Sequence, residues 1–377
     1  MGVRQARPRS RSERERIASL CAWFAREARD LPWRRRRTGY RALVAEAMLQ
    51  QTQVARVVDR YRAFVRRFPT LKSLAAANEQ EVLAQWQGLG YYLRARSLHA
   101  AAQMIVTDFG GRVPRDAKRL RKLPGIGRYT AGAIASIVYG QREAAVDGNV
   151  RRVLARWFAK PLTDDEAWGR AESLVEAAPD PGSLNEALME LGAVICTPRA
   201  PSCERCPVSR HCRAFQRGVQ ENLPLPRPAA RQKVVHHHAV VIFRGRGRGR
   251  NRKLLLERRP TNGLWSRMWQ VPTIESDRPL RPAEIRRRLA IAVDGLRRHA
   301  TFEHHTTHRR ITFHVYGASR EAGTRDEGRG TRRSQGRGTS EEGRGTRRKS
   351  VWRRPDDVGD LPMSNAQRRI LEGIGMG

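Results

Sequence analysis

The chain has 377 residues, and its 74 Lys and Arg against 37 Asp and Glu give a formal net charge of +37. No segment is apolar over the length of a membrane span, and the basic N-terminus lacks the apolar core of a secretory signal. These features exclude membrane and secreted classes and predict a cytoplasmic protein. Because most of the charge is arginine, whose planar guanidinium pairs with phosphates, nucleic acid is favoured over a membrane surface as the partner. An arginine bias spread over solvated faces would give the same composition.

The first half of the chain predicts helices almost throughout. Residues 1–16 indicate a basic, disordered tail, and the helical spacing of apolar residues after it predicts an all-α domain over residues 17–220. Cys21 lies on an apolar stripe at this spacing, which predicts a packing role. The prolines of Leu223–Pro228 cannot continue a helix, so we expect residues 221–235 to form a linker.

The chain beyond the linker predicts a smaller α+β domain over residues 236–377. Apolar runs at His238–Phe243 and Lys253–Arg258 indicate two strands around an Arg/Gly turn, and Arg310–Val315 indicates a third. Residues 318–350 hold the heptapeptide Glu-Gly-Arg-Gly-Thr-Arg-Arg twice and almost no apolar residues, so we expect a disordered insertion there. The predicted fold class is therefore multidomain, all-α followed by α+β.

Two acids in the helical region suit the chemistry of a glycosidic bond. Glu46 lies three residues from both Leu43 and Leu49, so it shares a helix face with apolar neighbours, and partial burial favours its protonated form. Asp147 opens another predicted helix. A neutral acid can protonate a leaving group while an ionised carboxylate stabilises an oxocarbenium-like sugar. Each acid also has an ordinary interpretation, Asp147 as a helix N-cap and Glu46 as a satisfied helix residue.

A glycine-containing turn separates two further predicted helices. In Leu123-Pro-Gly-Ile-Gly-Arg-Tyr-Thr-Ala131, Gly125 and Gly127 allow a tight turn before a helix rich in small residues. Backbone N–H groups at a helix start bind anions, so the segment has the signature of a helix-hairpin-helix phosphate site. An ordinary turn between packed helices is the alternative.

Four of the five cysteines lie in one short loop. Their spacing in a reducing compartment indicates a metal site more readily than disulfides, with six, two and five residues between Cys196, Cys203, Cys206 and Cys212. Four thiolates in one loop suit a single cubane iron-sulfur cluster, whereas structural zinc usually takes two Cys-x-x-Cys pairs. Zinc remains the alternative, since it also accepts four cysteines. No redox motif accompanies the loop, which favours a structural role.

These motifs together resemble MutY-type adenine DNA glycosylases of the helix-hairpin-helix superfamily. The resemblance covers roughly residues 17–220 in unbroken order. It is carried by Glu46-Ala-Met-Leu-Gln-Gln-Thr-Gln-Val54, Gly88-Leu-Gly-Tyr-Tyr92, the glycine turn, Val146-Asp-Gly-Asn149 and the cysteine loop. The resemblance implies a base-excision repair enzyme that hydrolyses the N-glycosidic bond of adenine mispaired with 8-oxoguanine or guanine.

The resemblance also implies roles for individual residues. Glu46 would protonate adenine at N7, Asp147 would stabilise or trap the sugar cation, and Asn149 would orient the acids. Relatives with lyase activity carry a nucleophilic Lys where this chain has Tyr129, and a phenol forms no Schiff base, so a monofunctional glycosylase is expected.

Other implied residues contact DNA or the cofactor. Gln51 and Tyr91 would fill the base stack while adenine is extruded, and Gly125 and Gly127 would bind a phosphate. The four cysteines would hold a 4Fe-4S cluster. The implied partner is double-stranded DNA with an adenine mismatch, bound by a monomer that associates with the nucleoid.

The second domain resembles the family's Nudix-like lesion-recognition domain. Gly263-Leu-Trp-Ser-Arg-Met-Trp269, Trp352-Arg-Arg-Pro355 and Leu361-Pro-Met-Ser364 fit that pattern, while the acidic box of Nudix hydrolases is missing, so pyrophosphatase activity is not expected. Where the family commonly has Phe-Ser-His for the contact with 8-oxoguanine, this chain has Phe302-Glu303-His304. A carboxylate there could accept from the N7–H of the lesion or repel the phosphate backbone.

Two other functions compete with this interpretation. An endonuclease III-like glycosylase on oxidised pyrimidines is disfavoured by Tyr129 and by the second domain. A DNA-binding module without catalysis is disfavoured by the paired acids, since binding a polyanion gains nothing from a carboxylate such as Glu46.

Overall fold

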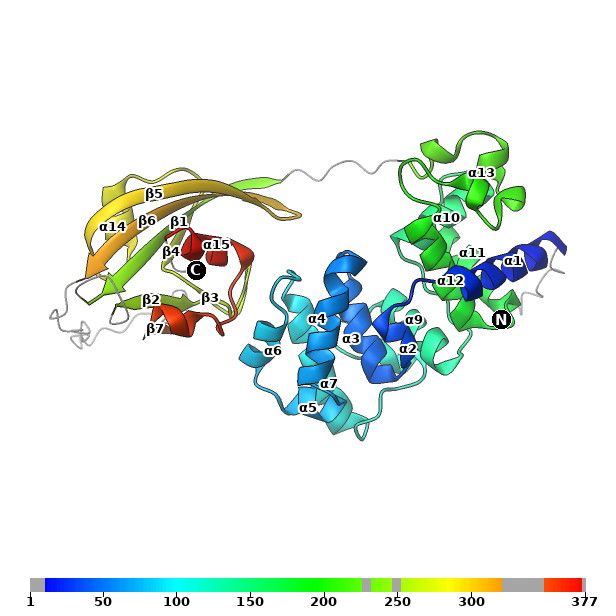
Figure 1. Cartoon of the computed structure of the whole chain (residues 1–377), viewed down its shortest axis with the longest axis horizontal. Coiled ribbons are helices and arrows are strands. Elements are labelled where there is room, and N and C mark those ends of the chain that lie inside the picture. The colour runs from blue at the N-terminus through cyan, green and yellow to red at the C-terminus, as the bar shows by residue number, and fades with distance from the viewer. Residues whose placement is uncertain (1–10, 226–231, 246–251, 321–348, 375–377) are drawn as a thin grey trace, which may run out of the picture. The chain divides into compact units, whose positions relative to one another are not determined.

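The computed structural model describes residues 11–225, 232–245, 252–320 and 349–374. These residues form two compact units. Unit 1 holds the described parts of Met1–Gln85 and Leu93–Pro228, and unit 2 holds those of Trp86–Tyr92 and Ala229–Gly377. Figure 1 shows unit 1 as helices and unit 2 as a sheet with helices.

Unit 1 contains only helices among its described residues, as the sequence predicts. The α-helices are α1 (Arg11–Glu27), α2 (Pro32–Arg35), α3 (Gly39–Leu49), α4 (Val54–Arg67), α5 (Leu71–Ala76), α6 (Glu79–Gln85), α7 (Leu93–Asp108), α8 (Ala117–Leu120), α9 (Arg128–Tyr139), α10 (Gly148–Phe158), α11 (Asp164–Ala177), α12 (Pro181–Val194) and α13 (Arg213–Gln216). Short 3-10 turns are η1 (Cys203–Arg205), η2 (Ser209–His211) and η3 (Gln220–Asn222).

Helix α1 begins earlier than the predicted end of the N-terminal tail. Residues 11–16 belong to the helix, and the remaining tail, residues 1–10, lies outside the described residues. Glu13 lies in the first turn, where the helix dipole favours an acid, and Arg11 pairs with Glu15 one turn on at 3.0 Å. These local interactions extend the helix into a segment that composition alone marks as disordered.

Capping residues and close packing position α12 against its neighbours. Asp180 accepts from the backbone at the start of α12, and Pro181 occupies the first turn, which fixes where the helix begins. Helix α12 packs against α1, α9 and α10. A Cβ on Gly192 of α12 would lie 2.6 Å from Cβ of Asn149, so only glycine allows α12 to approach the start of α10 this closely. Cys21 packs against the same apolar core, as predicted.

Unit 2 is built on a seven-stranded mixed sheet in which β1 and β6 pair in parallel and the other pairs are antiparallel. The strand order is β3-β2-β1-β6-β5, with β4 beside β1 and β7 beside β2. The strands are β1 (Lys233–Arg244), β2 (Lys253–Arg258), β3 (Trp269–Gln270), β4 (Thr273–Ser276), β5 (Asp294–His305), β6 (Arg309–Arg320) and β7 (Ser350–Arg353). The other elements are α14 (Pro282–Arg288), η4 (Pro355–Val358) and α15 (Asn365–Glu372).

Alternate residues of β1 build two cores on opposite faces of the sheet. Ala239 and Val241 pack with residues of α15, whereas Val240 and Ile242 pack with Ile285 of α14. Each face of the central strand is therefore covered by a helix, which confirms the α+β class predicted for this region.

The strand predictions are confirmed for the apolar runs. β2 has the predicted bounds, and β1 and β6 contain the predicted segments but are longer. β5, whose residues are mostly polar and exposed, had no apolar run to reveal it. Of the expected insertion, residues 321–348 lie outside the described residues, and its two ends belong to β6 and β7.

Candidate functional site

Unit 1 encloses a pocket of about 750 Å³ where α2, α3, α9, α10 and α12 meet. Its wall is mainly apolar, and Glu46, Tyr129, Asp147 and Asn149 all line it. The volume is typical of a cavity that binds a small organic group. The structure thus brings Glu46 into one pocket with Tyr129 and Asp147, which follow it by 83 and 101 residues in the sequence.

Glu46 lies on α3 with its carboxyl group facing the pocket. The pKa of Glu46 is raised to about 7, chiefly by desolvation and in smaller part by the negative charges of Asp147 and Glu186, against a lowering by the nearby Tyr129 hydroxyl. The group is therefore a carboxylic acid below neutral pH. This confirms the protonated form that the apolar helix face predicts.

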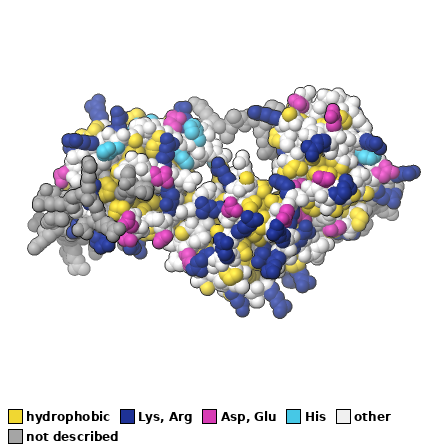
Figure 2. Space-filling model, viewed as in Figure 1, with side chains coloured by type: hydrophobic (Ala, Val, Ile, Leu, Met, Phe, Trp, Pro, Cys, Tyr) yellow, Lys and Arg dark blue, Asp and Glu magenta, His cyan; other side chains and the backbone are white. Residues whose placement is uncertain are grey.

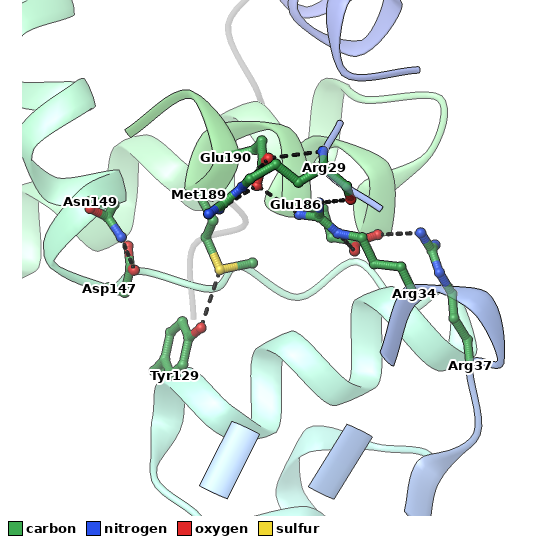
Figure 3. Close-up of polar contacts among 9 residues, drawn as sticks. All are labelled: Arg29, Arg34, Arg37, Tyr129, Asp147, Asn149, Glu186, Met189 and Glu190. Carbon is green, nitrogen blue, oxygen red and sulfur yellow. Dashed lines mark hydrogen bonds and ion pairs between the residues drawn. The ribbon is translucent and has the colours of Figure 1, made fainter. Parts of the chain in front are cut away.

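Asp147 is both the N-cap of α10 and a wall residue of the pocket. Its Oδ1 accepts from Val150 N at 2.7 Å, and its Oδ2 accepts from Asn149 Nδ2 at 2.9 Å (Figure 3). Burial raises the pKa of Asp147, and these hydrogen bonds oppose the rise. Arg152 Nη2 donates to Asn149 Oδ1 at 2.8 Å, which fixes the orientation of the amide. The capping and functional interpretations of Asp147 are thus compatible.

Tyr129 lies in the first turn of α9. Its hydroxyl donates to Met189 Sδ at 3.2 Å (Figure 3), and burial raises the pKa of Tyr129 well above its usual range. The phenol is therefore neutral and held in place beside the acids. A neutral phenol in this position can donate a hydrogen bond but cannot supply an amine nucleophile.

A network of arginine and glutamate residues, which the sequence did not reveal, forms part of the same wall. Glu190 accepts from Arg29 Nε at 2.7 Å and from Arg34 Nη2 at 3.0 Å, and Glu186 pairs with Arg34 and Arg37 (Figure 3). Burial by itself would raise the pKa of Glu190, but the hydrogen bonds from Arg29 and Arg34 hold it at about 2. The spacing of the two glutamates by one helical turn, among apolar residues of α12, is the sequence signal that could have revealed them.

The predicted hairpin precedes α9, with different roles for its two glycines. Gly125 has φ +76°, and a Cβ there would lie 2.6 Å from Cβ of Ser97, so glycine is required for both conformation and space. Gly127 has ordinary extended φ, is exposed, and is the N-cap of α9, where a Cβ would meet nothing within 4 Å. The expectation that both glycines make the turn is therefore correct only for Gly125. Gly127 instead leaves the helix start uncovered.

Gln51 and Tyr91 share an unusual backbone conformation. Their backbone φ angles are +55° and +46°, in the left-handed region that residues other than glycine rarely adopt. Both residues are exposed. Gln51 also lines the pocket. Such backbone strain concentrates at functional sites. Tyr92, the next residue, is buried, which is typical of a packing role.

The four cysteines of the predicted metal loop line a second, small cavity in unit 1. Buried Arg156 donates from Nη1 to Cys196 Sγ at 3.3 Å. Among the described residues, no three Cys, His, Asp or Glu side chains are gathered closely enough to hold one metal ion. Four cysteine thiols that line one cavity are a donor set that can take either a zinc ion or an iron-sulfur cluster.

Comparison with known proteins identifies the family. Residues 44–177 match the HhH-GPD superfamily of base excision DNA repair proteins, and residues 239–373 match a NUDIX domain. The sequence is 36% identical over 371 residues to the human adenine DNA glycosylase, an alignment covering 81% of this chain and 67% of that protein. The chain belongs to the adenine DNA glycosylase family.

Further relatives agree with this assignment. The rat adenine DNA glycosylase is 39% identical over 308 residues, with 68% of this chain and 60% of that protein covered. The chain thus spans less than two thirds of the rat relative's length. Among solved structures, a thermostable thymine-DNA glycosylase has a TM-score of 0.51 and 30% identity, covering 55% of this chain and 97% of that chain. A helix-hairpin-helix glycosylase domain followed by a Nudix-like domain is therefore the architecture of this family member.

In the Nudix-like unit, the residues expected to contact the lesion lie on β5 and do not share one face. Phe302 stacks on Phe313 with ring centroids 5.1 Å apart and packs into the core, and His304 lies beside Trp265 at 5.5 Å. Glu303, between them in the strand, is half-exposed. The alternation of a strand therefore separates the carboxylate from its two neighbours.

The described surface of unit 1 is strongly basic. Figure 2 shows Lys and Arg side chains gathered on the face over α2, α4 and α7. Helix α4 alone presents five exposed arginines, Arg56, Arg60, Arg62, Arg66 and Arg67.

Among the helices that the structure describes, none is both long and apolar enough to cross a membrane.

Proposed function

We propose that the protein is a monofunctional adenine DNA glycosylase that hydrolyses the N-glycosidic bond of adenine mispaired with 8-oxoguanine or guanine. The observation that carries the proposal is the placement of Glu46 and Asp147 in one pocket with different surroundings. No cation is among the groups that set the pKa of Glu46 at about 7, whereas Asp147 is held by several hydrogen bonds. One acid can then give a proton while the other bears negative charge.

In the proposed reaction, Glu46 donates its proton to N7 of an adenine extruded into the pocket. The bond between N9 and the sugar C1′ breaks, and its electron pair leaves with the neutral base. Asp147, oriented by Asn149, stabilises the positive charge that develops on the sugar, and water then adds to C1′ and releases a proton. Tyr129 offers no amine for a Schiff base, so the strand is not cut by the enzyme.

The remaining expected residues support DNA binding in this proposal. The uncovered helix start at Gly127 would take a phosphate, and Gln51 and Tyr91 would fill the space left by the extruded base. Phe302, Glu303 and His304 would approach the opposite base, with Glu303 as the exposed member. The enzyme would act as a monomer on duplex DNA.

We further propose that Cys196, Cys203, Cys206 and Cys212 hold a 4Fe-4S cluster. The cluster would bind the thiolates and keep the loop rigid beside the glycosylase core. Arg156 would offset part of its negative charge through the contact with Cys196. Zinc in the purified protein instead of iron and inorganic sulfide would contradict this proposal.

The decisive experiment uses a duplex with adenine opposite 8-oxoguanine, alongside duplexes with adenine opposite guanine and with thymine glycol opposite adenine. Strand breakage at the adenine only after hot alkali is the expected result, lost in Glu46→Gln and kept in the exposed control Glu176→Gln. Breakage without alkali, or cleavage of the thymine glycol strand alone, would refute the proposed function.

A further inference from the structure

Arg94, at the start of α7, binds the end of the helix that carries Glu46. Helices α3 and α7 pack against each other in unit 1. The Arg94 guanidinium donates to four acceptors in one short segment, namely the carbonyl oxygens of Ala47 at 3.0 Å, Met48 at 2.9 Å and Gln50, and Oγ1 of Thr52 at 3.1 Å. One side chain thus contacts both the last turn of α3 and the turn that follows it.

These bonds complete the hydrogen bonding at the C-terminus of α3. A helix leaves its last four carbonyl groups without partners inside the helix. In α3, Glu46 O accepts from Gln50 N at 3.3 Å, and Leu49 O accepts from Thr52 N at 3.2 Å. The two carbonyls between them are the ones that Arg94 binds. Its positive charge also lies at the negative end of the helix dipole.

The same guanidinium holds the turn in which Gln51 adopts its strained conformation. Gln51 lies between Gln50, whose carbonyl accepts from Arg94, and Thr52, whose hydroxyl does so. A left-handed residue other than glycine or asparagine costs about 1 kcal/mol or more and persists only where its surroundings fix it. The turn from Gln50 to Gln53 lines the pocket. Arg94 therefore fixes the backbone of the pocket rim.

We propose that Arg94 is a positioning residue for adenine excision, which rests on the function proposed above. Its guanidinium sets the end of α3, and with it the carboxyl group of Glu46, and presents the side chain of Gln51 at the rim of the pocket. Arg94 itself does not line the pocket. Its contribution is to the geometry of the reacting complex, and a misplacement of catalytic groups by about 1 Å can slow a reaction about 100-fold.

The test compares Arg94→Met and Arg94→Lys with the control Arg96→Met. Arg96 lies on the same helix, where it pairs with Glu79 at 3.7 Å, and it does not line the pocket. We measure the single-turnover rate of adenine excision at saturating enzyme and the Kd for a duplex with a non-cleavable adenosine analogue. The fluorescence of 2-aminopurine at the target position reports extrusion of the base.

Arg94→Met is expected to slow excision about 10- to 100-fold, with a change in Kd below about threefold and a smaller 2-aminopurine signal. Arg94→Lys keeps some hydrogen bonds to the carbonyls and should lie between Met and wild type. Arg96→Met should stay within about twofold of wild type. The thermal unfolding of all variants shows whether each is folded at the assay temperature.

Each contrary result has a distinct meaning. Wild-type rates in Arg94→Met overturn the positioning role and leave the proposed function intact. Equal losses in Arg94→Met and Arg96→Met, or a loss in proportion to the unfolded fraction, assign Arg94 to stability alone and also overturn it. An inactive wild-type enzyme on every adenine mismatch refutes the proposed function itself.

Discussion

Two glutamates line the same pocket, and their pKa values are shifted in opposite directions. Glu46, on α3, has no arginine among the groups that set its pKa, which rises to about 7, whereas Glu190, on α12, is bound by Arg29 and Arg34 and has a pKa of about 2. Both lose solvation in the fold. The difference teaches that a buried carboxyl without a cationic partner can become a proton donor, whereas one with cationic partners becomes a structural anion.

The sharpest way to test this contrast is to neutralise Glu46. Glu46→Gln keeps the shape of the side chain but removes the proton, so we expect the single-turnover rate to fall about 1,000-fold. The thermal melting temperature should not fall, because no salt bridge is broken. A rate within tenfold of wild type would show that the raised pKa has no catalytic use.

The matching change on the other wall is Glu190→Gln, which leaves Arg29 and Arg34 without their main anion. Breaking a buried ion pair from one side destabilises a fold by about 3 kcal/mol. Urea unfolding would measure the loss. The control is Glu172→Gln, whose pair with Arg128 is half-exposed, and which should cost less than about 1 kcal/mol. Equal costs would contradict the distinction between a buried and a half-exposed ion pair.

The pH dependence of excision follows from the direction of the Glu46 shift. An acid with a pKa of about 7 is protonated below that pH, so the rate should be level under acidic conditions and fall as the pH rises above 7. The expected fall is about tenfold per pH unit, or about 30-fold by pH 8.5. Single-turnover assays from pH 5 to pH 9 would show it. A rate that rises with pH would assign the proton to another group.

The smallest expected effect is a gain in stability. Because the folded state holds the Glu46 proton more tightly than the unfolded chain does, this residue's favourable contribution is complete below its ordinary pKa of 4.5 and is lost as the pH rises through about 7. Glu46→Gln should therefore be more stable than wild type by about 1 kcal/mol at pH 8, after allowance for water in the pocket, and equal at pH 4. Denaturant titrations at both pH values provide the comparison.

Local sequence determined much of the architecture and chemistry. Helical periodicity gave the all-α first domain, and the apolar runs gave β2 at its observed bounds and most of β1 and β6. The apolar neighbours of Glu46 gave its protonated form, because burial on a helix face follows from spacing alone. β5 was missed because its exposed, charged residues carry no such signal, and the start of α1 was missed because pairs one turn apart outweigh composition.

Tertiary structure decided which residues meet. The sequence could not show that α12 carries Glu186, Met189 and Glu190 into the pocket of Glu46, since contacts between distant segments depend on packing such as that permitted by Gly192. Nor could it show that Arg94 completes the end of α3 or that Gln51 is left-handed. The sequence by itself determined which groups can do the chemistry, because residue type and local burial set their reactivity. Only the fold decided their partners and geometry, because those arise where separate helices pack together.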